Sequence, residues 1–97
     1  MFIKFPISWA SIVNRIEWTG DLDDDCTAKW CGLLLRAEWM DGTRWWWAVS
    51  DVVSGQEIDS SNNSGYFDVE FTSGIAARHA AEKAAREYRQ RIKPSTF

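Results

Sequence analysis

Apolar residues recur at helical spacing near the C-terminal end of the chain, over residues 73–93. Ser73 is a favourable N-cap residue, and Pro94 ends the pattern. One side of the expected helix forms a mostly small apolar stripe, made of Ala77, Ala81, Ala84, Ala85, Tyr88 and Ile92. Because small side chains let a helix lie close to its neighbour, this stripe predicts packing against a sheet.

A second helical pattern lies near the start of the chain. Ser8 can cap a helix over residues 8–18, in which Trp9, Ile12, Val13 and Ile16 follow the spacing i, i+3, i+4, i+7. A strand around Asn14 is the alternative, because Ile12, Ile16 and Trp18 also share one face of an extended chain. The segment TGDLDDD that follows combines glycine with clustered carboxylates, which predicts a loop.

Residues 27–61 predict a three-stranded antiparallel meander. The stretch from Cys26 to Met40 is strand-like, and Asp41-Gly42 favours a two-residue type I′ turn into the next strand. The register that follows pairs Met40 with Thr43, Trp39 with Arg44, Ala37 with Trp46 and Leu35 with Ala48. Gly32 is interpreted as a bulge or a bend in the long first strand.

This register divides the three consecutive tryptophans, residues 45–47, between two faces. Trp46 is predicted to be buried opposite the small Ala37, on the face that also carries Leu33 and Leu35. Trp45 and Trp47 are predicted on the second face. There Glu38 and Arg36 lie across from them, and Arg36 can place its guanidinium over the Trp47 ring.

The third strand is expected to end near Ser61, with its register left open. A two-residue Ser54-Gly55 turn would put Ile58 on the side of Trp45 and Trp47, whereas one bulged residue would return it to the core side. Residues 66–71 alternate apolar and acidic side chains. They are either an edge strand or an extended run into the last helix.

The pattern therefore predicts one small α+β domain spanning residues 1–97, with the order α-β-β-β-α. The long C-terminal helix is expected to cover the Leu33, Leu35 and Trp46 face of a three-stranded antiparallel sheet.

Composition favours a folded domain, because 45% of the 97 residues are apolar and 26% are charged. The start lacks a signal-peptide pattern and no apolar run reaches membrane-spanning length, so we expect a cytoplasmic protein without membrane contact. The net charge of −3 is uneven, with −7 in residues 1–75 and +4 in residues 76–97. Such asymmetry is typical either of a binding surface or of simple solvation.

Neither metal chemistry nor catalysis is predicted. Asp21, Asp23 and Asp25 begin like a calcium loop, but Cys26 stands where the sharp turn needs glycine and Gly32 where the bidentate glutamate belongs. The soft ligands Cys26, Cys31 and His79 fall in unrelated elements, and the cysteines are expected to be reduced thiols. We therefore expect no cofactor, no metal and no enzymatic activity.

Nucleic-acid binding is the alternative function. The α-β-β-β-α order is similar to that of double-stranded-RNA-binding domains, whose last helix presents basic residues to phosphates. The corresponding residues here would be Arg78, Lys83 and Arg86. These basic residues are few and the sheet is acidic, so we do not expect nucleic acid as the partner. A resemblance of topology does not by itself imply a function.

Three interpretations of the second aromatic face remain. It is covered by other apolar residues of the chain, or it binds a protein or a second copy of the chain, or it stacks bases. We predict a non-enzymatic interaction module, of accessory or inhibitor type, that binds another protein or forms a homodimer. The expected contact residues are Arg36, Glu38, Trp45 and Trp47 on the strand face and Asp21, Asp23 and Asp25 in the acidic loop.

Overall fold

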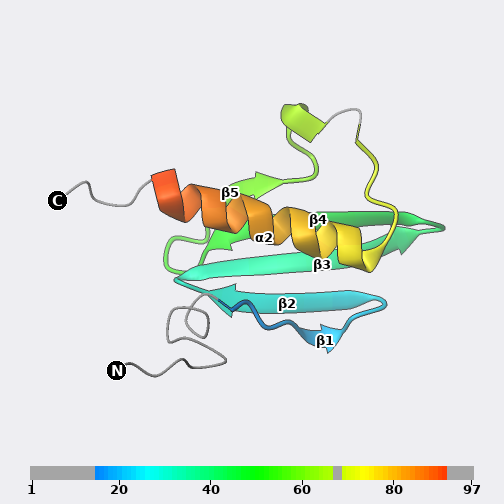
Figure 1. Cartoon of the computed structure of the whole chain (residues 1–97), viewed down its shortest axis with the longest axis horizontal. Coiled ribbons are helices and arrows are strands. Elements are labelled where there is room, and N and C mark those ends of the chain that lie inside the picture. The colour runs from blue at the N-terminus through cyan, green and yellow to red at the C-terminus, as the bar shows by residue number, and fades with distance from the viewer. Residues whose placement is uncertain (1–14, 67–68, 92–97) are drawn as a thin grey trace, which may run out of the picture.

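The protein folds as an antiparallel five-stranded sheet with a long helix across one face (Figure 1). The computed structural model describes residues 15–66 and 69–91. The strands follow one another in chain order and are β1 (Thr19–Asp21), β2 (Asp25–Trp30), β3 (Leu33–Asp41), β4 (Arg44–Asp51) and β5 (Glu57–Ser60). A 3₁₀ turn at Ser64–Tyr66 and the helix α2 (Gly74–Arg91) complete the described chain.

The predicted α+β class is confirmed, but the sheet has five strands rather than three. The stretch from Cys26 to Met40 is two strands, because the chain reverses at Cys31 and Gly32. These residues have φ of +49° and +78°, the left-handed conformation that a two-residue type I′ turn requires at both positions. Gly32 therefore belongs to a hairpin turn, and β1 extends the sheet beyond β2.

The predicted register between β3 and β4 is wrong by one residue. Asp41 pairs with Arg44, and the ladder then resumes with Trp39 opposite Trp45, so Met40 is an extra residue on β3. Gly42 does have the predicted positive φ of +52°, but the turn residues are Gly42 and Thr43 rather than Asp41 and Gly42, because Asp41 pairs with Arg44. The predicted type I′ turn is wrong, since Asp41 does not have the positive φ that this turn requires. Since side chains alternate along a strand, the single bulged residue exchanges the two faces of β4.

The exchange changes the place of each tryptophan. Trp47, not Trp46, lies opposite Ala37 and is 0% exposed beneath the helix. Trp46 lies on the other face of the sheet, where the Arg36 guanidinium carbon is 5.9 Å from its ring centroid. Trp45 is on the helix side and is partly buried at the end of the sheet.

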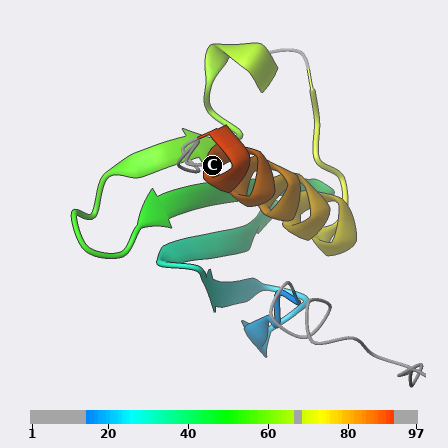
Figure 2. The ribbon, with the colours of Figure 1, turned by 60° about the vertical axis from the view of Figure 1, so that its left-hand side comes forward.

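The core lies between α2 and the middle of the sheet (Figure 2). Its large members on the sheet are Leu33, Leu35, Trp47 and Val49, and the alanine stripe of α2 is buried against them as predicted. Tyr66 and Phe71 close the core at its side, with ring centroids 5.1 and 5.9 Å from Trp47. Both pairs have the edge-to-face geometry that aromatic rings favour.

The predicted N-cap of the last helix is confirmed. The Ser73 hydroxyl accepts a hydrogen bond of 3.1 Å from the Ala76 N–H. The expected end at Lys93 and the stripe residue Ile92 lie outside the described residues. On the solvent side of the stripe, the Trp18 indole N–H donates to the Glu82 carboxylate at 2.8 Å, which ties the segment before β1 to the helix.

The predicted helix over residues 8–18 falls mostly outside the described chain. Residues 15–18, which are described, are not helical. The third strand of the predicted meander is β5, which ends at Ser60, and a bulge opposite Val49 and Ser50 leaves Ile58 packed against the core. Residues 69–71 are an extended run that meets the sheet through one bridge, between Trp45 and Phe71. In the described part of the chain, no helix is long and apolar enough to cross a membrane.

Candidate functional site

One end of the molecule gathers four segments that are distant in sequence. The β1–β2 turn, the tip of the β3–β4 hairpin, residues 69–73 and the start of α2 all lie at the right of Figure 1. We call this region the hairpin end. Its apolar residues are Leu22, Trp39, Met40, Trp45, Val69 and Ile75.

Specific contacts hold these segments together. The Arg78 guanidinium donates to the Leu22 carbonyl at 2.8 Å, which joins α2 to the β1–β2 turn. The Trp45 N–H donates to the Phe71 carbonyl, also at 2.8 Å, and brings the run before the helix against β4. The Trp39 N–H donates to the Asp24 carbonyl at 2.7 Å. These hydrogen bonds hold the four segments together at the hairpin end.

This surface is unusually apolar for an exposed region. Trp39 is 43% exposed, Met40 52% and Ile75 60%, and Leu22 and Val69 are exposed as well. Among the described residues, the remaining large exposed apolar side chains are Val52 and Val53, in the β4–β5 turn. Clustered aromatic and methionine side chains at a surface are the composition that the centres of protein interfaces favour.

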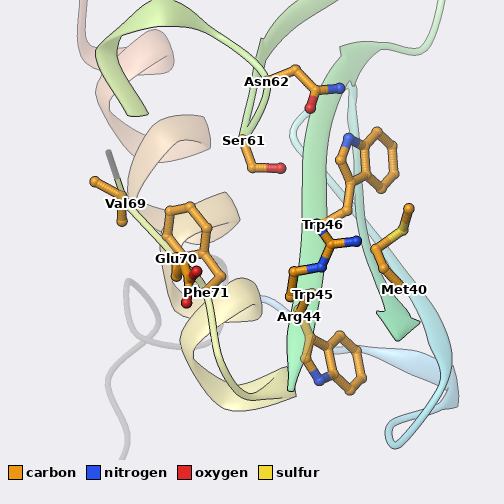
Figure 3. A pocket seen from close by; sticks show the side chains of 9 residues that line it. All are labelled: Met40, Arg44, Trp45, Trp46, Ser61, Asn62, Val69, Glu70 and Phe71. Atoms are coloured by element: carbon orange, nitrogen blue, oxygen red, sulfur yellow. The ribbon is translucent and has the colours of Figure 1, made fainter. Parts of the chain in front are cut away.

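A pocket of about 240 Å³ opens beside this surface. It lies between the N-terminal half of β4 and two segments beyond the outer edge of that strand, residues 61–62 and 69–71 (Figure 3). The Trp46 indole stands between Asn62 and Met40 in this view, and Glu70 faces the Arg44 side of the pocket. The pocket thus combines an aromatic ring with charged and amide groups.

One ion pair at the hairpin tip, between Arg44 and Asp41, lies beside the pocket. Arg44 binds Asp41 through two nitrogens, with Nε–Oδ1 and Nη2–Oδ2 distances of 3.0 and 2.8 Å. The hydrogen bonds from Arg44 lower the pKa of the Asp41 carboxyl, and the same bonds raise the pKa of Arg44. Glu70 raises the pKa of Arg44 only through its charge, and more weakly than Asp41 does.

A second charged group lies on the sheet face away from α2, which we call the open face and define by Asp25, Arg36, Glu38 and Trp46. The Arg36 guanidinium donates to both oxygens of Asp25 at 3.3 Å and lies 3.8 Å from the Glu38 carboxylate. Its hydrogen bond to Asp25 raises the pKa of Arg36. Arg36 therefore connects these acids to the Trp46 ring.

The predicted contact residues are only partly brought together. Asp25, Arg36 and Glu38 meet on the open face, and Asp21 and Asp23 lie at the nearby β1–β2 turn. Trp45 lines the pocket, but Trp47 is core and offers no surface to a partner. The sequence interpretation missed Trp46, Met40, Val69 and Glu70. The register error concealed Trp46, and no pattern in the sequence links residues 69–70 to the hairpin.

The basic residues of the nucleic-acid alternative each have a partner within the chain. Arg78 is bound to the Leu22 carbonyl, and the Lys83 ammonium is 3.1 Å from the Glu87 carboxylate. The Arg86 guanidinium lies 5.1 Å from the ring centroid of Trp30. These contacts spread the three cations along α2 and do not form a single phosphate-binding group.

A carboxylate of the acidic β1–β2 turn is used in closing the turn itself. Asp21 Oδ1 accepts a hydrogen bond of 2.9 Å from the Asp23 N–H. Aspartate carboxylates commonly close turns by such a bond to the backbone two residues later. Over residues 15–66 and 69–91, no three side chains of histidine, cysteine, aspartate or glutamate are grouped to hold a metal ion. Cys26 is a buried free thiol and Cys31 an exposed one.

Comparison of the chain with protein-family models, with curated proteins and with solved structures finds no match.

Proposed function

We propose that the protein is a non-enzymatic interaction module, of accessory or inhibitor type, that binds another protein through its hairpin end. The observation that carries the proposal is the group of exposed apolar side chains there, above all Trp39, Met40 and Ile75. Energetic centres of protein interfaces are enriched in tryptophan and surrounded by polar groups. The Asp41–Arg44 pair and the acidic β1–β2 turn supply such a polar surround.

The charges favour a protein over a nucleic acid as the partner. Asp41, Glu70 and the aspartates of residues 21–25 would repel phosphates that approach the hairpin end. The same carboxylates would attract a partner with lysine or arginine around an apolar centre. We further place the protein in the cytoplasm, where the exposed thiol of Cys31 would remain reduced.

The test compares four forms of the protein as baits for cell proteins. We expect the unchanged chain and Val53→Ser to retain the same protein, whereas Trp39→Ala and Met40→Ser lose it. Val53 is the matched control because it is an exposed apolar residue, 95% accessible, in the β4–β5 turn rather than at the hairpin end. Nuclease treatment should leave the retained protein unchanged.

Two results would contradict the proposal. The first is that Trp39→Ala and Met40→Ser retain the same partner as Val53→Ser. The second is that nuclease treatment removes the partner. Light scattering on the purified chain separates self-association from binding of another protein. A homodimer that Met40→Ser dissociates would identify a second copy of the chain as the partner.

A further inference from the structure

We propose that the pocket beside Trp46 receives an arginine side chain of the partner protein. The inference rests on the proposed function, because it names the group of the partner that the hairpin end recognises. With a volume of about 240 Å³, the pocket is smaller than the roughly 300–1,000 Å³ of ordinary small-molecule sites. A single long side chain suits this size better than a metabolite or a nucleotide.

The lining of the pocket matches the two chemical properties of a guanidinium group. The Trp46 ring and the Met40 side chain provide apolar surface for a flat group, and tryptophan is the aromatic residue that attracts cations most strongly. Glu70 provides a carboxylate, which accepts two parallel hydrogen bonds from arginine, and Asn62 adds an amide oxygen. Lysine lacks the planar guanidinium that could stack on the Trp46 ring and bind the Glu70 carboxylate through two hydrogen bonds at the same time.

Two arginines of the chain lie near this place, and each is bound to an aspartate. Arg44 lines the pocket, but Asp41 holds it through two hydrogen bonds of 3.0 and 2.8 Å. Arg36 is bound to Asp25 and comes from β3, whereas Asn62 and Glu70 lie beyond the opposite edge of β4. Among the described residues, no lysine or arginine nitrogen lies within 4.0 Å of the Glu70 carboxylate.

In the described part of the chain, an arginine lies over a tryptophan ring at two places. Arg36 lies over Trp46 with its guanidinium carbon 5.9 Å from the ring centroid, and Arg86 lies over Trp30 at 5.1 Å. The net charge of −7 over residues 1–75 would also draw a cationic segment toward the sheet. An arginine of the partner at Trp46 would therefore make the same kind of contact that arginines of the chain make with Trp46 and Trp30.

The probe for this inference is N-acetyl-arginine N-methylamide, titrated into the full-length chain. Its neutral isostere, N-acetyl-citrulline N-methylamide, and the corresponding lysine derivative serve as comparisons. Binding is followed by the indole N–H signal of Trp46 in ¹H–¹⁵N spectra, assigned with Trp46→Phe. We expect a saturable shift in the millimolar range with the arginine probe, a weaker effect of the lysine probe and none of the citrulline probe.

Two variants locate the contact. Glu70→Gln should weaken binding of the arginine probe by about fivefold, the effect of losing an exposed ion pair near the upper end of its usual range. Glu57→Gln removes an equal charge from β5, whose residues do not line the pocket, and should leave the affinity unchanged. Equal binding of citrulline, or equal losses in the two variants, would overturn the inference.

The results for the probe and for the protein partner are separable. If the arginine probe fails to shift the Trp46 signal while Trp39→Ala still loses the partner, the pocket inference is wrong and the proposed function stands. If the probe binds at Trp46 but the hairpin-end variants retain the same proteins as Val53→Ser, the proposed function is wrong and the chemistry of the pocket stands.

Discussion

Residues 45–47 show how three identical side chains acquire three different roles. Trp47 points into the core, where the edges of aromatic rings and the alanine helix enclose it. Trp46 points to the open face and lines the pocket, and Trp45 fills the space between β4 and the start of α2. Alternation along the strand separates Trp46 from the other two. Trp45 and Trp47 share the helix side and differ in their place along β4, since Trp45 lies near the start of α2 and Trp47 lies in the core.

Replacing Trp47 by alanine should cost roughly 3–5 kcal/mol in the free energy of unfolding, because it removes a fully buried indole and leaves a cavity. Trp46→Ala should cost about 1 kcal/mol or less, since the partly exposed ring loses mainly its contact with Arg36. Urea unfolding of the two variants measures both quantities. Equal losses would contradict the observed register of β3 and β4.

The sequence correctly predicted that one of the three tryptophans is buried opposite Ala37 and that Leu33 and Leu35 are core. It assigned Trp46 to that place instead of Trp47, because it placed the side chains of β4 on the wrong faces. Alternation shows only that neighbours face opposite ways, and a run of three tryptophans fits either phase. The bulge at Met40 decides between them. Nothing in the hydrophobic pattern marks that bulge, because Met40 fits a regular strand position equally well.

At the scale of elements, the β3–β4 turn is easier to predict from the sequence than the β2–β3 turn. Asp41-Gly42 is a common turn sequence, and Gly42 has the expected positive φ. Cys31-Gly32 is not, because a cysteine side chain is strained at positive φ and the flanking residues continue a strand-like pattern. The sequence therefore predicted the β3–β4 hairpin but missed the β2–β3 hairpin. It also assigned β1 (Thr19–Asp21) to a loop, so that five strands were predicted as three.

The strain at Cys31 leads to a stability prediction. Cys31→Asn should raise the free energy of unfolding by about 0.5–1 kcal/mol, because asparagine tolerates the observed φ of +49° better than cysteine does. Cys31→Ser is the matched control, since it removes the thiol but keeps a side chain without this preference. Denaturant unfolding under reducing conditions compares the two. A gain of the same size in Cys31→Ser would show that the turn geometry is not the cause.

The β4–β5 turn predicts a dependence of stability on pH. The backbone N–H groups of Ser54 and Val53 donate to Asp51 at 3.0 and 2.9 Å, and these hydrogen bonds lower the pKa of the Asp51 carboxyl. A lowered folded-state pKa stabilises the fold above the ordinary aspartate pKa, and this contribution is lost as the pH falls below about 4. Thermal unfolding of Asp51→Asn should therefore show a smaller decrease in Tm between pH 5 and pH 3. Parallel curves for the two proteins would contradict this role of Asp51.

At the scale of the whole molecule, the hairpin end exists only because distant segments meet there. The sequence predicted an aromatic strand face and an acidic loop as contact regions, and the fold brings only the start of β4 and the β1–β2 turn to this end, because Trp47 is core. It gave no sign that residues 69–71 would complete the pocket, because that contact depends on where the chain crosses the sheet edge before α2. Local patterns specify elements well, whereas a site shared by four segments follows from their packing.

Gly74 lies where the start of α2 meets Trp45 of β4 and Leu22 of the β1–β2 turn, and it supports a prediction for the whole arrangement. A Cβ atom there would lie 2.9 Å from the Trp45 ring, 2.9 Å from the Arg78 guanidinium and 3.0 Å from the Leu22 carbonyl oxygen. The start of α2 therefore cannot gain a side chain unless these side chains and the β1–β2 turn move. Alanine normally favours a helix over glycine by up to about 1 kcal/mol. Overpacking of this kind costs about 1–3 kcal/mol, which outweighs the gain in helix propensity.

Gly74→Ala should therefore lower the free energy of unfolding and shift the backbone amide signals of Leu22 and Trp45, although neither residue is close to Gly74 in sequence. Gly65→Ala is the control, because a Cβ at Gly65 meets no atom within 4 Å and should leave both stability and those signals nearly unchanged. Urea unfolding and ¹H–¹⁵N spectra of the two variants make the comparison. A stabilised Gly74→Ala variant with an unchanged Leu22 signal would show that α2 does not lie against the β1–β2 turn, and the hairpin end would then not be one surface.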